Sequence, residues 1–220
     1  THIGHDFLED SDERFDFYHQ KEEKIPFDIE YLNKITGGGV TRKSLNILMA
    51  GTGVGKTIGM CHMAASNLTI GKNVLYVTME MAEERIAERI DANLLDIKLD
   101  NLKDLTKPMY DKKMNALKSK VKGKIVIKEF PTSQAHTGHF RHLLNELWLK
   151  KSFKPDIIYV DYLNICASQR LTGSNSVNSY TYVKSIAEEL RGLAVEFNVP
   201  IWSATQTTRS GFGNSDVGLE

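Results

Sequence analysis

The sequence predicts an α/β fold in which a mostly parallel, twisted sheet carries helices on both faces. Five short apolar runs alternate with longer helical segments, which is typical of βαβ units. The expected strands are 44–50, 73–80, 124–130, 156–166 and 200–206. The expected helices are 57–70, 82–95, 137–151 and 180–198, with short helices around Pro108. Strands that are apolar throughout need cover on both faces, so helices must pack on each side of the sheet.

The individual elements follow from local pattern. Segment 156–166, "DIIYVDYLNIC", is rich in β-branched and aromatic residues and indicates a central strand. Segment 82–95 places Ile86, Ile90 and Leu94 at four-residue steps, so these side chains share one face of a helix. The polar stretch 167–179, which follows the 156–166 strand, offers no core residues and indicates a loop.

The chain divides into two unequal parts. Residues 1–24 are rich in charge and show no strong period, so we expect a linker segment there. Phe15, Phe17 and Tyr18 would be poorly placed in solvent, which suggests that this linker docks on a neighbour. Residues 25–220 form one expected domain. We expect it to be truncated at its C-terminus, because the sequence stops in a glycine-rich stretch after the last strand.

Charge and composition exclude several classes of protein. The chain has 220 residues, with 28 basic and 28 acidic side chains, so it offers no overall basic field for a nucleic acid. Any contact with nucleic acid must therefore be local, or be assembled from several copies. No apolar run approaches the roughly 20 residues of a membrane span, so we expect no membrane partner. Cys61 and Cys166 stand alone in apolar segments and indicate reduced core residues of a cytoplasmic protein.

A glycine-rich segment, "AGTGVGKT" at 50–57, lies between an expected strand and an expected helix. It fits the G-x-x-x-x-G-K-[ST] phosphate-binding pattern, except that Ala50 stands at the first glycine. In this pattern backbone amides surround the phosphates, Lys56 reaches the β- and γ-phosphates, and Thr57 gives its hydroxyl to Mg²⁺. The predicted nucleotide-binding residues are Gly51, Thr52, Gly53, Val54, Gly55, Lys56 and Thr57. The alternative is a tight turn without a ligand, but both flanking elements favour the phosphate loop.

Three other expected strands end in polar residues: Glu80, Asp161 and Gln206. Ligands of open α/β sheets lie beyond the carboxyl ends of the strands, so these side chains are candidates for the same site. Asp161 could hold Mg²⁺, Glu80 could orient and deprotonate the attacking water, and Gln206 could bind the γ-phosphate. Strand ends are also polar simply because they meet solvent. Contact with solvent could explain any one of these polar residues alone. It explains less well why all three occur together with a phosphate loop.

These segments together resemble a known family. The resemblance rests on the segments "IPFDIEYLNKITGGGV" (25–40), "AGTGVGKT", "TMEM" (78–81), "IIYVDYLN" (157–164) and "ELRGLAVEFNVPIWSATQTTR" (189–209). In order and spacing they resemble the RecA-like ATPase domain of DnaB-type hexameric replicative helicases over residues 25–213. Their amino-acid sequences are similar to those of the helicases of T-even-type bacteriophages. The resemblance implies a RecA-like P-loop NTPase core.

The resemblance also implies an activity and its participants. The domain would hydrolyse ATP, or another NTP, with Mg²⁺, to move along single-stranded DNA and unwind duplex at a replication fork as a homo-hexamer. Arg209 would act near the nucleotide or the DNA, and loops 167–179 and 210–220 would contact the strand. Primase and a helicase loader would be partners, in the cytoplasm of the host cell if the protein is phage-encoded. The family's N-terminal collar and the segment with its arginine finger have no counterpart in this sequence.

Two other classes are compatible with a RecA-like core. One is a recombinase or mediator ATPase that binds DNA as a filament without unwinding it. The other is a RecA-fold scaffold that binds ATP and does not translocate. The shape of the particle on DNA in the presence of ATP, a closed ring, a filament or neither, distinguishes the three.

Overall fold

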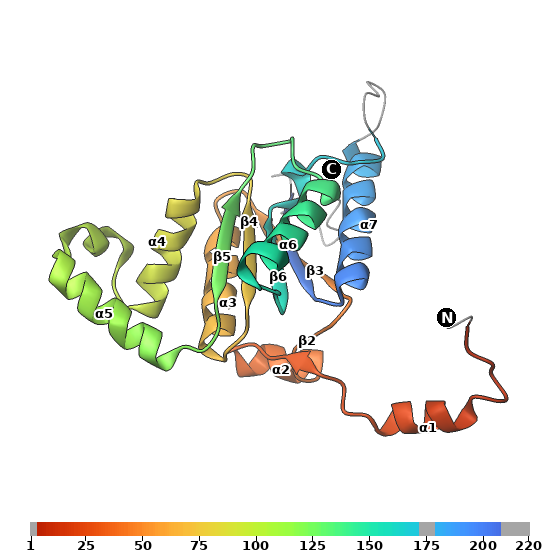
Figure 1. Ribbon diagram of the computed structural model, residues 1–220. Helices are drawn as coiled ribbons and strands as arrows, with labels where there is room; N and C mark the ends of the chain where they lie inside the picture. Colours follow the sequence, from red (N-terminus) through yellow and green to blue (C-terminus); the bar gives the residue numbers. More distant parts are fainter. Residues whose placement is uncertain (1–3, 172–178, 208–220) are drawn as a thin grey trace.

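The fold is built on one five-stranded parallel sheet (Figure 1). A computed structural model describes residues 4–171 and 179–207. The strands are β3 (Leu45–Gly51), β4 (Val74–Thr78), β5 (Ile125–Glu129), β6 (Ile157–Asp161) and β7 (Ile201–Thr207). They lie in the order β3-β7-β6-β4-β5, and every neighbouring pair is parallel. The predicted α/β class is confirmed.

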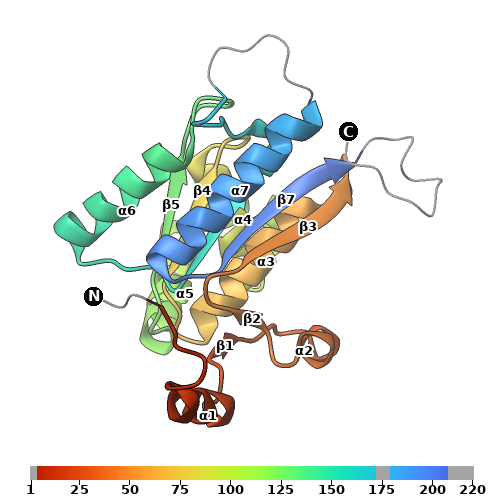
Figure 2. The ribbon, with the colours of Figure 1, turned by 90° about the vertical axis from the view of Figure 1, so that its right-hand side faces the viewer.

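Helices cover both faces of this sheet. They are α3 (Lys56–Thr69), α4 (Glu83–Leu94), α6 (Thr137–Lys151) and α7 (Ser179–Phe197). Helices α3 and α4 lie on one side of the sheet, and α6 and α7 on the other (Figures 1 and 2). The first two crossover connections of the sheet therefore pass over one face and the last two pass over the other. Parallel neighbours need such crossovers, because a tight hairpin can join only antiparallel strands.

The two central strands supply both halves of the core. Successive residues of a strand point to opposite faces. Tyr76 and Tyr159 accordingly pack toward α3 and α4, with their rings stacked at a centroid distance of 5.8 Å. Val77 and Val160 pack toward α6 and α7. Strands β4 and β6 are buried along their whole length, which explains why their sequences are apolar without alternation.

The register brings the carboxyl ends of the strands to one edge. Thr78 of β4 lies opposite Asp161 of β6, and Gly51 of β3 lies opposite Thr207 of β7. The residues that follow or end these strands must therefore meet at the same edge. This alignment gathers side chains that are far apart in the sequence.

The strand expected over 156–166 is shorter than predicted. Strand β6 ends at Asp161, and the 3₁₀ helix η2 (Leu163–Ile165) follows. The apolar residues continue because Leu163 and Cys166 are buried beneath α7, and not because they pair in the sheet. An apolar run alone does not separate these two situations.

The prediction of short helices around Pro108 is wrong in part. The 3₁₀ helix η1 (Leu99–Asp104) is short, but α5 (Lys107–Lys120) has 14 residues. Pro108 lies in the first turn of α5, where its missing N–H breaks no helical hydrogen bond. No residue of α5 is buried, so the helix lies on the outside of the molecule, where the Tyr110 hydroxyl donates a hydrogen bond to Asp91 of α4 at 3.2 Å.

The N-terminal part contains one helix that stands apart. Helix α1 (Ser11–His19) has no buried residue, and Figure 1 shows it away from the sheet. Helix α2 (Glu30–Thr36) and the two-stranded antiparallel sheet of β1 (Lys24–Ile25) and β2 (Val40–Thr41) connect it to the domain. Both cysteines are buried and unpaired. Within the described residues, no helix has the length and apolar character needed to cross a membrane.

Candidate nucleotide-binding and catalytic site

The phosphate-binding pattern forms a loop between β3 and α3. Gly53 and Gly55 have φ angles of 76° and 103°, a left-handed region that glycine adopts without the strain of a side chain. The loop borders a cavity of ≈ 250 Å³, which the predicted loop residues line except Val54, whose side chain is exposed. Glu80 and Gln206 line the same cavity, as do Met81 and Arg89.

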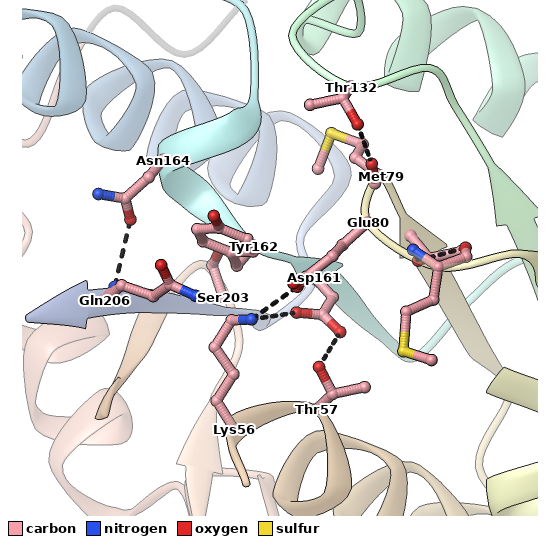
Figure 3. A network of polar contacts seen from close by, with 12 residues as sticks. Lys56, Thr57, Met79, Glu80, Thr132, Asp161, Tyr162, Asn164, Ser203 and Gln206 are labelled. Atoms are coloured by element: carbon pink, nitrogen blue, oxygen red, sulfur yellow. Dashed lines mark hydrogen bonds and ion pairs between the residues drawn. The ribbon is translucent and has the colours of Figure 1, made fainter. Parts of the chain in front are cut away.

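Lys56 is the centre of the site. Its side chain is 8% exposed, and its Nζ lies 2.8 Å from Glu80 Oε2 and 3.8 Å from Asp161 Oδ1 (Figure 3). The ammonium group also lies 3.9 Å from the centroid of the Tyr162 ring. A buried ammonium group needs opposite charge nearby, and the two carboxylates provide it. Glu80 lies two residues beyond the end of β4, so it does not itself end the strand.

Asp161 ends β6 as predicted and is completely buried. Its Oδ2 accepts hydrogen bonds from the hydroxyls of Thr57 (2.9 Å) and Tyr76 (3.0 Å). Burial raises the pKa of the Asp161 carboxyl, and the nearby Lys56 and the hydroxyl of Thr57 oppose that rise. Its Oδ1 has no hydrogen-bond partner among the described residues. A buried carboxylate oxygen with free acceptor capacity, next to a threonine hydroxyl, fits the oxygen ligands that Mg²⁺ prefers.

Gln206 reaches the site from β7, and Asn164 fixes the strand there. The side-chain oxygen of Asn164 accepts a hydrogen bond from the Thr205 hydroxyl (2.9 Å). It accepts a second one from the Gln206 backbone amide (3.4 Å; Figure 3). Asn164 is not predicted from the sequence, because an asparagine after a strand carries no motif. Arg209 lies outside the described residues.

The loop expected at 167–179 is described at residues 167–171 only, before the helix α7. Glu189 of α7, which is buried, holds this part. Its carboxylate accepts hydrogen bonds from the Ser168 hydroxyl (2.7 Å) and from the backbone amides of Gln169 (3.0 Å) and Arg170 (3.2 Å). The side chain of Arg170 pairs with Glu188 at 3.2 Å. The remainder of this loop and residues 210–220 lie outside the described residues.

The family of the chain is shown by comparison with known proteins. The family model of the DnaB-like helicase C terminal domain matches residues 25–216. The chain belongs to this family. The DnaB-like replicative helicase of enterobacteria phage T4 is 48% identical over 222 aligned residues, which cover all of this chain and 46% of that protein.

Two solved structures have the same fold. One is a DnaB-like replicative helicase studied with its interactions with primase. It matches with a TM-score of 0.71 and 17% identity, over 93% of this chain and 48% of that one. The other is an isolated ATPase domain, with a TM-score of 0.68 and 17% identity, over 93% of this chain and 71% of that one. The expected RecA-like core is confirmed. The chain spans about half the length of the T4 relative.

Glu189 leads to a prediction about stability and pH. Burial acts to raise the pKa of its carboxyl, but the hydrogen bonds from the Gln169 amide, the Ser168 hydroxyl and the Arg170 amide outweigh it and lower the pKa below the ordinary 4.5. A lowered pKa stabilises the folded state above the ordinary value, and this stabilisation disappears as the pH falls through the lowered pKa.

Glu189→Gln should therefore lower the free energy of unfolding by about 1–3 kcal/mol at neutral pH, because one side-chain oxygen becomes an N–H donor facing a donor. The loss should shrink in acid, where the wild-type carboxyl is protonated as well. Urea unfolding of the wild type and the variant, at neutral and at acidic pH, measures this difference in the free energy of unfolding. Glu188→Gln, on the exposed neighbour, is the matched control and should change little. Equal losses for both variants would contradict the role of Glu189.

Proposed function

We propose that this domain is the ATP-driven motor of a replicative DNA helicase. It would hydrolyse ATP, or another NTP, to move along single-stranded DNA and to unwind duplex at the replication fork. The observation that carries this proposal is the contact of Lys56 and Thr57, from the phosphate loop, with Glu80 and Asp161 at the strand ends. That group of side chains occurs in a chain of the DnaB-like family.

The contacts support a separate role for each of these side chains in ATP hydrolysis. The phosphate tail would take the cavity bordered by the glycine loop, where backbone amides face it. Lys56 would then exchange Glu80 for phosphate oxygens, which leaves the Glu80 carboxylate free to orient and deprotonate water. Thr57 and Asp161 would hold Mg²⁺, which neutralises charge on the phosphates. Gln206, whose strand is fixed by Asn164, would contact the γ-phosphate.

Contact with DNA is proposed for loops 167–179 and 210–220. In the sequence these loops come after strands β6 and β7, which carry Asp161 and Gln206, so a change at the nucleotide could be passed along the chain to them. Glu189 anchors the start of the first loop through three hydrogen bonds. Arg170 would release Glu188 when it binds a phosphate of the strand. Arg209 would act at the start of the second loop.

A homo-hexameric ring is proposed because two surfaces of the chain, helix α1 and a groove beside α5, complement each other in charge and in apolar character. Helix α1 exposes Phe15 and Phe17 (61% and 69%) and carries acidic side chains at Asp12, Glu13 and Asp16. A groove of ≈ 610 Å³ beside α5 has an apolar wall that includes Leu117 and Phe153. The lysines lining it are Lys118, Lys122, Lys124 and Lys151, and the lining includes no carboxylate among the described residues. The aromatic, acidic α1 of one copy would fit the apolar, basic groove of the next.

The partners and the location of the complete protein are proposed from the similarity to other proteins. One structural neighbour is a DnaB-like replicative helicase whose interactions with primase were studied. We extend this to primase and a helicase loader as partners of the complete protein. From the similarity to a protein of phage T4 we also propose that the activity takes place in the cytoplasm of an infected host cell.

The first test concerns nucleotide binding and unwinding. In the full-length protein, Lys56→Ala should abolish tight ATP binding and DNA unwinding. Charge-assisted hydrogen bonds to two phosphates are lost, which lowers affinity by about 10²-fold or more. Calorimetry and a strand-displacement assay measure the two effects, and circular dichroism checks the fold. Lys98→Ala, on an exposed lysine, serves as the control. Unwinding by a folded Lys56→Ala protein would overturn the proposed function.

The second test separates binding from hydrolysis. Glu80→Gln should keep ATP affinity, because Lys56 no longer has to leave a charged partner. It should slow hydrolysis by about 10²–10⁴-fold, the usual contribution of a general base. Steady-state ATPase rates of the assembled protein with single-stranded DNA measure this. The exposed Glu84→Gln on α4 is the control. A Glu80→Gln enzyme with normal turnover would reduce Glu80 to a counter-charge for Lys56.

The third test concerns the ring. Glu13→Lys on α1, and separately Lys122→Glu in the groove, should each reduce assembly of the full-length protein through repulsion between like charges. The two changes together should restore it, since the charges are exchanged across one interface. Light scattering with nucleotide present measures the mass of the particle. Assembly that neither single change affects would exclude this contact.

A further inference from the structure

Two buried polar side-chain atoms have no hydrogen-bond partner among the described residues: Asp161 Oδ1 and Arg89 Nε. Buried polar atoms in folded proteins are nearly always paired, so each such atom calls for an explanation. Asp161 belongs to the proposed magnesium site. Arg89 has no role in the function described above, and yet its side chain lines the same ≈ 250 Å³ cavity as the phosphate loop.

The position of Arg89 is fixed by its helix. Ile86 and Ile90, on the same side of α4, are buried at 0% and 4% exposure against the α3 face of the core. The backbone around Arg89 is therefore held firmly beside α3, which begins at the phosphate loop. Side chains of a helix lean toward its N-terminus, and here that direction leads to the cavity.

The charge of Arg89 is not compensated within the described part of the chain. Among the described residues its side chain makes one hydrogen bond, from Nη1 to the Arg85 carbonyl of its own helix, at 3.0 Å. Arg85, one turn earlier, instead pairs with Glu88 at 2.9 Å. Lys56, the other cation that lines the cavity, already shares its charge with Glu80 and lies near Asp161. The cavity thus has one neutralised cation and one that still lacks an anion.

We propose that Arg89 binds a phosphate oxygen of the nucleotide from the α4 side of the cavity. The assignment rests on the proposed function, because it places a further ligand-binding residue in the same site. A guanidinium group has several N–H donors in a fixed plane and suits phosphate oxygens well. The bound phosphate would give the charge of Arg89 the anion that it lacks, and its side chain would close the cavity opposite Lys56.

The experiment compares Arg89→Met with Arg85→Met in the full-length protein. Both variants remove a guanidinium from α4, one inside the cavity and one in a surface pair. Calorimetry with a non-hydrolysable ATP analogue and Mg²⁺ should show about 10- to 100-fold weaker binding for Arg89→Met, and unchanged binding for Arg85→Met. Arg89→Lys should recover part of the loss. Thermal melting confirms that each variant is folded.

Competition by inorganic tripolyphosphate identifies the bound group. Arg89→Met should weaken its binding as much as that of the nucleotide, because the contact is to phosphate. Weaker nucleotide binding with unchanged tripolyphosphate binding would overturn the assignment in favour of the ribose or the base. Unchanged affinity with a lower kcat would overturn it in favour of an action through Glu80. Absence of nucleotide binding by the unaltered protein would overturn the proposed function itself, and this assignment with it.

Discussion

The ion pair between Lys56 and Glu80 is the interaction on which the geometry of the site depends. An ammonium group that is 8% exposed is costly unless an opposite charge lies within a few ångströms. Glu80 meets this need at 2.8 Å, and Asp161 adds a second carboxylate at 3.8 Å. The pair forms only if β3, β4 and β6 end at the same level, as their parallel register ensures. The order of the strands therefore determines the chemistry at their ends.

The same ion pair would link nucleotide binding to the availability of the Glu80 carboxylate as a general base. In the proposed function, phosphate and Glu80 would compete for one ammonium group, so the arrival of the phosphate tail would release the carboxylate that deprotonates water. Without nucleotide, Glu80 is held by Lys56. The charge of Asp161 is disfavoured by burial, which raises the pKa of its carboxyl. A divalent cation would favour the charged form of that carboxyl, so magnesium and nucleotide binding would support each other.

Much of the site could be predicted because it follows local motifs. The phosphate loop, Asp161 and Gln206 each stand at a strand end, and the rule for open α/β sheets brings strand ends together. Asn164, Glu189 and Arg89 could not be predicted in this way. Asn164 and Glu189 form hydrogen bonds with segments that are distant in the sequence, and Arg89 lies at the cavity of the phosphate loop only in the folded chain. None of the three has a spacing that marks it.

The wrongly predicted bounds of helices and strands also have reasons that lie in the packing of the folded chain. The strand over 156–166 was predicted too long because η2 is as buried as the strand before it. Helix α5 was predicted too short because Pro108 indicates a break, although a proline in the first turn begins a helix well. Helix α1 has no face against the domain, so its sequence shows no core-facing pattern.

The exchange of partners by Lys56 is the central claim, and a structure of the full-length protein with Mg²⁺ and a non-hydrolysable ATP analogue tests it most directly. The account predicts that Lys56 Nζ leaves Glu80 Oε2, now 2.8 Å away, for phosphate oxygens, while Asp161 Oδ1 gains a partner through the metal or its water. A bound nucleotide beside an intact Lys56–Glu80 ion pair would contradict the account.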